Sequence, residues 1–259
     1  MPVHDDLGKR MKEYYENIPK TKLMRRTPVA MRIDGKAFHT FTRGFKKPFD
    51  YNLITSMQYT MKYLCENIQG CVFGYTQSDE ITLILVDYKK FNSSAWFDNE
   101  IQKMCSIAAS MATMYFNKCF RNNIDIENRI TPDEIKYYDT LHKAAEKGAM
   151  FDCRVFNIPK EEVANLIYWR QVDATRNSIQ MVGQAYFSEK QLHGKSQSMI
   201  QDMLHEVHSI NWNDYSIVEK RGSACYKNND GSWIIDYTMP ILKGENREYV
   251  EKHIYISEE

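Results

Sequence analysis

The sequence predicts an α+β fold with a ferredoxin-like βαββαβ core, followed by a helical C-terminal part and a terminal β-hairpin. Short apolar runs rich in β-branched residues indicate strands, and apolar residues spaced by three and four indicate helices. The core elements follow in the order strand, helix, hairpin, helix, strand, which is the split βαβ order. They lie at residues 29–33, 50–70, 71–86, 99–120 and 152–159.

The first half of this core places carboxylates at strand ends. The strand over 29–33 closes with Asp34 and Gly35, and the helix over 50–70 begins at Asp50, a suitable N-cap. The two apolar runs that follow flank the polar turn Ser78-Asp79-Glu80, which is typical of a hairpin with Asp79 near its tip. When the first strand lies beside this hairpin, Asp34 and Asp79 meet at one edge of the sheet.

Several helices are expected outside the core. A short charged helix is expected over 5–18, and a capping box at 131–134 begins an inserted helix that runs to about Gly148. The later helices are expected at 161–174, at 177–187, and from Ser188 or Ser196 to about 207.

The chain ends in a predicted hairpin over 223–238, because two β-forming runs flank Asn228-Asn229-Asp230-Gly231. We predict a boundary between two domains near Pro159. Residues 1–159 then form a catalytic palm core with an N-terminal helix and an inserted helix, and residues 160–259 form a helical region with the hairpin.

Composition excludes several protein classes. No apolar run approaches the ~20 residues that a membrane span needs, and the N-terminus lacks a signal-peptide core. The six cysteines form no Cys-x-x-Cys pair, which is typical of buried thiols in a reducing compartment, so we expect a cytoplasmic protein without membrane association. Net charge is zero, but residues 1–50 hold twelve Lys and Arg against six acids, which is compatible with a polyanionic substrate.

The carboxylates of Asp34 and Asp79, beside a backbone carbonyl, make a site suited to Mg²⁺ and a phosphate substrate. A ferredoxin-like sheet that presents two aspartates is the palm arrangement of polymerases and nucleotide cyclases, in which two metal ions align the reacting oxygens. The cation-rich segment that includes His39 and Lys47 is a candidate triphosphate site, with an ordinary surface loop as the alternative. The run at 205–208 lacks the spacing of a zinc motif, and the sequence contains no P-loop.

Four groups of residues together resemble the tRNA(His) guanylyltransferase family. The resemblance covers roughly residues 5–240, and the motifs lie in the family's order. They are Arg32-Ile-Asp-Gly-Lys-Ala-Phe-His39 with Lys47-Pro-Phe-Asp50, Gly74-Tyr-Thr-Gln-Ser-Asp-Glu80, Trp169-Arg-Gln-Val-Asp-Ala174 with Arg176-Asn-Ser178, and Leu192-His-Gly-Lys-Ser196.

This resemblance implies nucleotide addition in the 3′-to-5′ direction at the 5′ end of a tRNA. It implies two Mg²⁺ ions held by Asp34, Asp79 and the Gly35 carbonyl, with Glu80 as a further catalytic residue. It also implies nucleotide-binding residues at Arg32, Lys36, Ala37, Phe38, His39, Lys47 and Ser78. Contacts to the triphosphate or the RNA end are expected from Arg170, Asp173, Asn177 and Lys195. For Arg170 and Asp173, an ion pair that braces the helix is an equal alternative.

The family's reaction has two steps, in which ATP or GTP activates a 5′-monophosphate and the 3′-hydroxyl of an incoming nucleotide then displaces the nucleoside monophosphate. Eukaryotic members carry His-Ile-Asn-Asn-Leu-Tyr-Asn after Trp-Arg-Gln-x-Asp, whereas residues 175–181 here are Thr-Arg-Asn-Ser-Ile-Gln-Met. This resembles the bacterial and archaeal branch, which is associated with templated repair of 5′-truncated tRNAs as well as G addition to tRNA(His). The resemblance also implies a homotetramer.

Two other function classes stay open at this point. A nucleotide cyclase or a conventional palm polymerase would use the same carboxylate pair. A non-catalytic RNA-binding module would present stacking aromatic residues on its sheet and would not need that pair. A chelator separates the module from the enzymes, because simple RNA binding survives metal removal.

Overall fold

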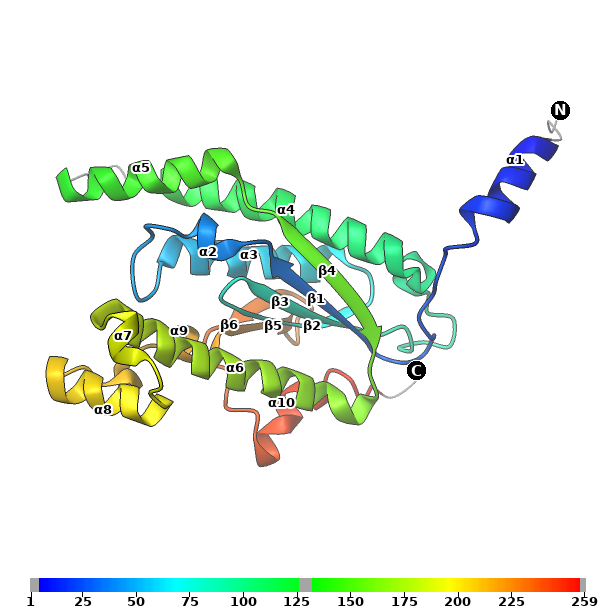
Figure 1. Ribbon diagram of the computed structural model, residues 1–259. Coiled ribbons are helices and arrows are strands. Elements are labelled where there is room, and N and C mark those ends of the chain that lie inside the picture. Colours follow the sequence, from blue (N-terminus) through cyan, green and yellow to red (C-terminus); the bar gives the residue numbers. More distant parts are fainter. Residues whose placement is uncertain (1–4, 126–131, 257–259) are drawn as a thin grey trace.

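The computed structural model describes residues 5–125 and 132–256. Within these residues, six strands form one antiparallel sheet in the order β4-β1-β3-β2-β5-β6 (Figure 1). The strands are β1 Val29–Gly35, β2 Cys71–Gln77, β3 Glu80–Leu85, β4 Phe151–Asn157, β5 Ser223–Lys227 and β6 Trp233–Asp236. The hairpin β2–β3 lies beside β1, and β4 completes the predicted βαββαβ core.

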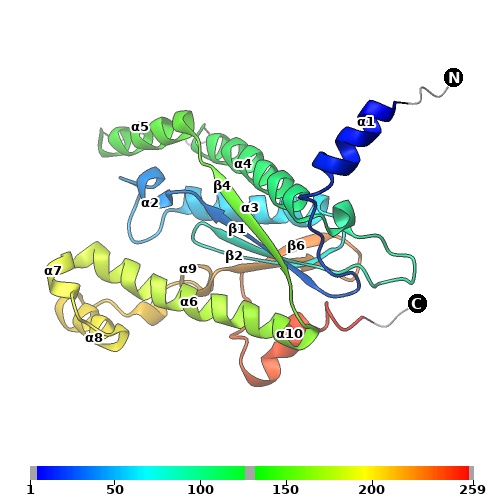
Figure 2. The same cartoon turned by 45° about the vertical axis from the view of Figure 1, so that its right-hand side comes forward.

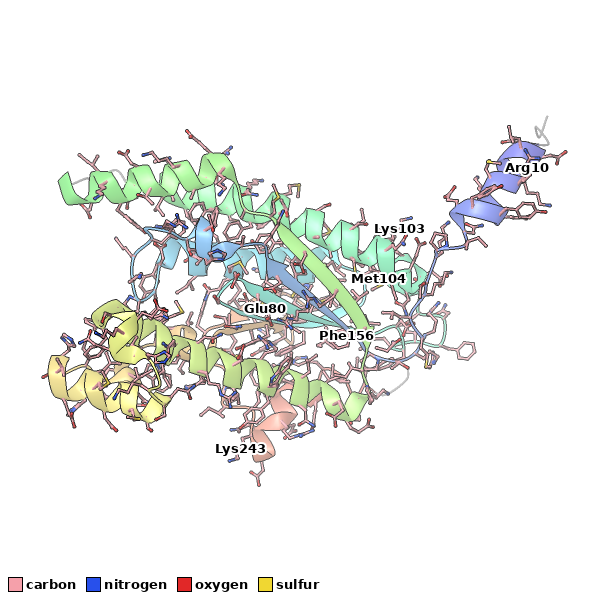
Figure 3. All side chains as sticks on the ribbon, in the orientation of Figure 1. Arg10, Glu80, Lys103, Met104, Phe156 and Lys243 are labelled. Carbon is pink, nitrogen blue, oxygen red and sulfur yellow. The ribbon has the colours of Figure 1, made fainter. Side chains whose placement is uncertain are left out.

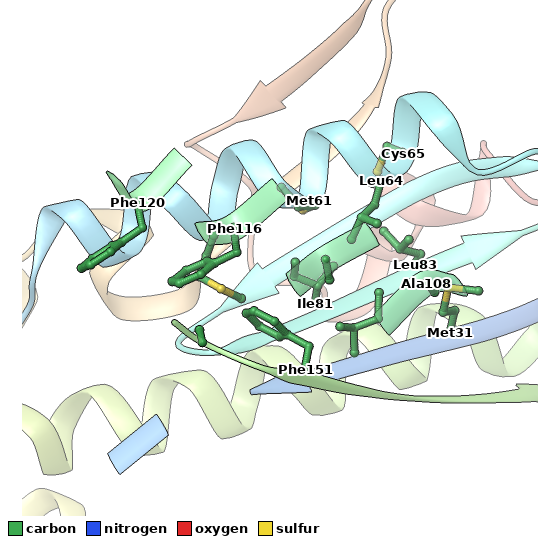
Figure 4. Close-up of a cluster of buried hydrophobic side chains, with 14 of the residues drawn as sticks. Met31, Met61, Leu64, Cys65, Ile81, Leu83, Ala108, Phe116, Phe120 and Phe151 are labelled. Atoms are coloured by element: carbon green, nitrogen blue, oxygen red, sulfur yellow. The ribbon is translucent and has the colours of Figure 1, made fainter. Parts of the chain in front are cut away.

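Two helices cover one face of the sheet. They are α3 (Tyr51–Asn67) and α4 (Ile101–Asp125), and their apolar stripes pack on alternate residues of β1 and β3, including Met31 and Ile33 (Figure 4). The Asp50 carboxylate caps α3 by accepting the backbone N–H groups of its first turn, as predicted. The larger of the two hydrophobic clusters on the sheet is therefore on this face.

One long helix, α6 (Lys160–Tyr186), covers the other face (Figure 2). The prediction of two helices with a break between 174 and 177 was wrong. Ala174, Ser178 and Ile179 are all buried, so the buried stripe of α6 continues through this segment. Tertiary packing outweighs the weak helix propensity of Thr175 and the neighbouring Asn and Ser residues.

The terminal hairpin belongs to the same sheet as the core. β5 pairs with β2, and β6 pairs with β5. The second segment, residues 160–259, therefore adds two strands and the covering helix α6 to the sheet of residues 1–159. The division of the chain near Pro159 stays a prediction.

The shorter helices follow the predicted positions closely. Ser188 and Ser196 cap two successive helices, and the inserted helix forms, although Thr131 of its capping box lies outside the described residues. The remaining helices are α1 Asp6–Met11, a π-helical turn Lys12–Glu16, α2 Phe38–Phe41, α5 Pro132–Lys147, α7 Glu189–Leu192, α8 Gln197–His208, α9 Ile217–Arg221 and α10 Glu248–Glu251. Short 3₁₀ turns occur at Trp96–Asn99, Trp212–Asp214 and Gly244–Arg247.

The N-terminal helix extends away from the sheet, with Arg10 labelled on it (Figure 3). Its apolar residues, including Leu7 and Tyr14, are exposed, so it adds nothing to the core. Across the ranges given above, no helix has the length and hydropathy to cross a membrane.

His253 gives the fold a pH dependence. Its ring lies 5.8 Å from Phe73 and 5.0 Å from Tyr226, and burial together with Lys252 and Lys89 lowers its pKa to about 4. Because the unfolded chain binds this proton near the ordinary pKa of ~6.5, the free energy of unfolding falls by about 2–3 kcal/mol as pH drops from 6.5 through 4.

We expect the variant His253→Phe to lose this part of the acid sensitivity, which urea unfolding between pH 4 and pH 7 would measure. His193→Ala, at an exposed position, is the control and keeps the wild-type profile. An equal slope in wild type and His253→Phe would contradict the assignment.

Candidate active site

Asp34 and Asp79 lie together at one end of the sheet. Asp34 is near the end of β1, where its register partner on β3 is Glu80, the residue after Asp79. The Gly35 backbone N–H donates to the Asp79 carbonyl at 3.0 Å, which joins the end of β1 to the hairpin tip. The two carboxylates are therefore brought together by strand pairing and by one turn hydrogen bond.

The hairpin tip is a two-residue turn with an unusual backbone. Ser78 has φ of 50°, in the left-handed region, and its hydroxyl donates to Asp79 Oδ1 at 3.0 Å. Burial raises the pKa of Asp79, the nearby charge of Asp34 raises it further, and the hydrogen bond from Ser78 opposes the shift. A divalent cation between the two carboxylates would remove this electrostatic cost.

The turn after β1 is fixed by an aromatic anchor. A Cβ at Gly35 would lie 2.2 Å from the Phe38 ring, so only glycine permits this approach. Phe38 is buried against Phe116 and Phe151, with ring centroids 5.7 and 5.2 Å away. Ala37 takes a left-handed φ of 53°, and the turn leaves Lys36 and His39 exposed beside the carboxylates. Phe38 is thus a structural anchor of the expected nucleotide-binding turn.

Asp50 holds the next loop in place. Its carboxylate accepts the Lys46 backbone N–H at 3.0 Å and the Tyr137 hydroxyl at 2.7 Å. The Lys46 ammonium lies 4.5 Å from the centre of the Tyr137 ring, and Lys47 follows it in the loop. Sequence reasoning identified Asp50 only as a cap and did not find Tyr137, which comes from the inserted helix α5.

These segments enclose a cavity of about 580 Å³. Met181 and Gln184 from the C-terminal half of α6 line its far side, and neither was predicted. The predicted site residues that line it are Asp34, Gly35, Ala37, Phe38, His39, Lys47, Ser78 and Asp79. A cavity of this size and lining suits a nucleotide whose phosphates face the lysines.

Glu80 is directed away from this cavity into the protein. It is 4% exposed, and Arg170 of α6 binds it in a bidentate pair, Nε–Oε1 at 2.6 Å and Nη2–Oε2 at 2.8 Å. Arg32 adds a third contact, Nη2–Oε2 at 2.9 Å. Burial raises the pKa of Glu80 above its ordinary value, and the two arginines oppose that shift. The geometry therefore gives Glu80 a bracing position between β3 and α6.

The remaining predicted residues do not line this cavity. Asp173 accepts Arg170 Nη2 at 2.9 Å, which is the helix-bracing pair named as the alternative. Asn177 borders an adjoining apolar groove that shares Met181 with the cavity. Lys195 is exposed on the turn between α7 and α8 and is not a lining residue of the cavity.

The residues present fit a Mg²⁺ site of the two-carboxylate kind. In residues 5–125 and 132–256, no cluster of three or more His, Cys, Asp or Glu side chains is placed to bind a metal. Two carboxylates leave coordination positions to water and substrate phosphates, which is how Mg²⁺ is usually held. Asp34 and Asp79 would hold the ion, and the Gly35 carbonyl stays a predicted ligand.

The bracing position of Glu80 predicts a stability effect. In Glu80→Gln, the buried Arg170 keeps only Asp173 as an anionic partner and the partly buried Arg32 loses its partner, so the free energy of unfolding should fall by about 3 kcal/mol. Glu66→Gln is the control, because Glu66 lies 3.8 Å from Lys62 on the surface and its loss costs about 1 kcal/mol or less.

Urea unfolding at neutral pH measures both changes. The double variant Glu80→Gln/Arg170→Met should recover part of the loss, since it removes one of the unpaired charges. If Glu80→Gln is no more destabilised than Glu66→Gln, the network does not brace α6 against the sheet.

Comparisons with known proteins agree with this geometry. The family model for tRNAHis guanylyltransferase matches residues 8–159. A bacterial tRNA(His) guanylyltransferase-like protein solved in complex with ATP has 41% identity and a TM-score of 0.84, covering 96% of this chain and 100% of that one. One solved in complex with GTP has 39% identity and a TM-score of 0.78, covering 97% and 100%.

A relative of lower identity is also a tRNA(His) guanylyltransferase. The tRNA(His) guanylyltransferase of Debaryomyces hansenii is 24% identical over 240 residues, which cover 86% of this chain and 83% of the relative. The family match extends over the sheet edge that carries Asp34 and Asp79, and the bacterial structures extend it over almost the whole chain. This chain belongs to the tRNA(His) guanylyltransferase family of nucleotidyltransferases.

Proposed function

We propose that this chain adds nucleotides in the 3′-to-5′ direction to the 5′ end of tRNA, with two Mg²⁺ ions at its active site. The observation that carries the proposal is that Asp34 and Asp79 line a cavity of about 580 Å³ together with Lys46 and Lys47. Carboxylates for the metal and cations for the phosphates are the two requirements of phosphoryl transfer. The ATP and GTP complexes of the bacterial relatives support nucleotides as its substrates.

The chain's own residues position the reactants. Asp34, Asp79 and the Gly35 carbonyl would hold the ions, which would favour the ionised hydroxyl and stabilise charge on the leaving group. Lys47 and His39 line the cavity, and in this proposal they donate hydrogen bonds to the triphosphate. Ser78 orients the Asp79 carboxylate through its hydroxyl.

The reaction has two steps, activation of the RNA 5′ end and addition of the nucleotide. First, an oxygen of the RNA 5′-monophosphate attacks the α-phosphorus of ATP or GTP, and pyrophosphate leaves. Second, the 3′-hydroxyl of the incoming nucleoside triphosphate attacks the activated 5′-phosphorus, loses its proton, and displaces the nucleoside monophosphate. Catalysis then depends mainly on alignment and on charge stabilisation.

The preferred substrate is a tRNA that lacks 5′ nucleotides, repaired against its opposing strand, with G addition to tRNA(His) as a second activity. Residues 175–181 support this choice, because they depart from the eukaryotic run and resemble the bacterial and archaeal branch. They lie in the middle of α6, and Met181 among them lines the cavity. A cytoplasmic location and a homotetrameric assembly belong to the same proposal.

The test is a 5′-end extension assay. A tRNA transcript that lacks its first nucleotide and carries a labelled 5′-monophosphate is incubated with Mg²⁺, ATP and each nucleoside triphosphate in turn. Wild type should add the nucleotide complementary to the opposing base, and Asp79→Asn should be slower by at least about 10²-fold, because it removes a metal ligand. Asp139→Asn, at an exposed carboxylate on α5, is the matched control and keeps wild-type activity.

Two results would change the proposal. Addition of G alone, whatever the opposing base, would identify a strict guanylyltransferase and reject templated repair. No extension with any nucleotide would reject 5′-end polymerisation, and a chelator-resistant RNA complex would then favour the binding module.

A further inference from the structure

A second cavity lies at the opposite end of the sheet. It has a volume of about 560 Å³ and is bordered by the C-terminal end of α3, the loop after β3, and the facing ends of β5 and β6. The seven residues of β2 run between the two ends, which places this cavity about 20 Å from the carboxylates at ~3.3 Å per residue. It is therefore separate from the active site.

Three lysines line this second cavity, namely Lys89, Lys90 and Lys227, and no acidic side chain of the described residues forms an ion pair with any of them. Glu66 also lines the cavity, but it pairs with Lys62 at 3.8 Å, and Asp87 in the loop after β3 pairs with Arg25. The C-terminal end of α3 contributes only about half a negative charge, against three positive ones. The cavity thus keeps an excess of positive charge.

The lysines are held on an ordered surface. Gln69, just beyond α3, donates to the Ser94 carbonyl at 3.1 Å and to its hydroxyl at 2.7 Å, and Ser93 Oγ accepts the Lys90 backbone N–H at 3.0 Å. These bonds fix the loop that carries Lys89 and Lys90 to the end of the helix. The positive charges are therefore partly preorganised for a ligand.

Two aromatic side chains accompany the charges. Trp233 is half-buried in the wall of the cavity, with Lys227 Nζ 5.6 Å from its ring centre. Phe91 follows Lys90 directly and is 90% exposed, which is unusual for a phenylalanine. A groove that combines lysines with exposed ring faces is the arrangement by which proteins bind RNA strands, through phosphates and stacked bases.

We propose that this second cavity is an RNA-strand contact site, at which Lys89, Lys90 and Lys227 bind consecutive phosphates and Trp233 and Phe91 stack on unpaired bases. This inference rests on the proposed function, because it assumes that the substrate is an RNA. A strand is favoured over a free nucleotide because the exposed Phe91 adjoins the cavity without lining it. The site would hold the body of the RNA while its 5′ end occupies the active site.

Tryptophan fluorescence gives a direct readout. In a Trp169→Phe background, Trp96 and Trp212 are buried and Trp233 is the most exposed tryptophan, so a ten-residue single-stranded RNA should quench the part of the emission that Trp233→Phe removes. Phe91→Ala should weaken the affinity by about 5- to 100-fold, the range for the loss of one stacked base. Its position is exposed, so a folding defect is not expected.

The salt dependence of binding tests the lysines. The variant Lys89→Gln/Lys90→Gln/Lys227→Gln should reduce the slope of log affinity against log salt by about 2, since each single-strand phosphate contact contributes about 0.7. The control replaces three scattered exposed lysines, Lys118, Lys190 and Lys243, and should keep the wild-type slope. Asp79→Asn should also keep it.

The possible results separate the RNA contact site from the proposed function. A wild-type slope and affinity in the triple variant would overturn it, as would complete displacement of the RNA from Trp233 by equimolar free GTP, which would indicate a mononucleotide site. Failure of the proposed function looks different, because the 5′ end would not be extended while the oligonucleotide still quenched Trp233. Extension without any Trp233 quenching would reject the inference and leave the function intact.

Discussion

The buried contact of Glu80 with Arg170 and Arg32 is the interaction on which the rest of the site depends. Arg170 comes from α6 and Arg32 from β1, so one carboxylate at the start of β3 joins three elements at N···O distances of 2.6–2.9 Å. Glu80 and Arg170 are taken out of water, and such a buried pair is stable only while both partners remain. The contact therefore fixes α6 against the sheet directly behind the hairpin tip.

The neighbouring acids Asp79 and Glu80 therefore have different roles. Glu80 is neutralised by arginines inside the protein, whereas Asp79, one residue earlier, has no cationic partner in the described part of the chain and faces the cavity. The left-handed backbone of Ser78 and the hydrogen bond from Gly35 set its position. The backbone places Asp79 beside Asp34, and the buried network keeps that backbone still.

Much of the fold could be predicted from the sequence, because its elements are encoded locally. Strand ends at Gly35 and Gln77, the cap at Asp50 and the serine caps of α7 and α8 follow from nearby residues. The continuity of α6 could not be predicted. Polar residues at 175–178 are typical of a helix break, and only the sheet that α6 covers makes the buried stripe continuous.

The positions of site residues at the ends of neighbouring strands could be predicted. The contacts of site residues with residues far away in the sequence could not. Asp34 and Asp79 follow from two strand ends at one edge. The family resemblance implies a catalytic role for Glu80, which stays a prediction. Its ion pair with Arg170 could not be predicted, because the two residues are 90 positions apart. Tyr137 is likewise 87 positions from Asp50 and carries no sequence signal of its role.

The central claim is that Asp34 and Asp79 form one divalent-cation site, and Mn²⁺ binding followed by electron paramagnetic resonance tests it most directly. The account predicts that Asp34→Asn and Asp79→Asn each weaken Mn²⁺ binding by at least about 10-fold, and that the double variant is little worse than either single one, because both ligands serve the same ions. Unchanged Mn²⁺ affinity in both single variants would contradict it.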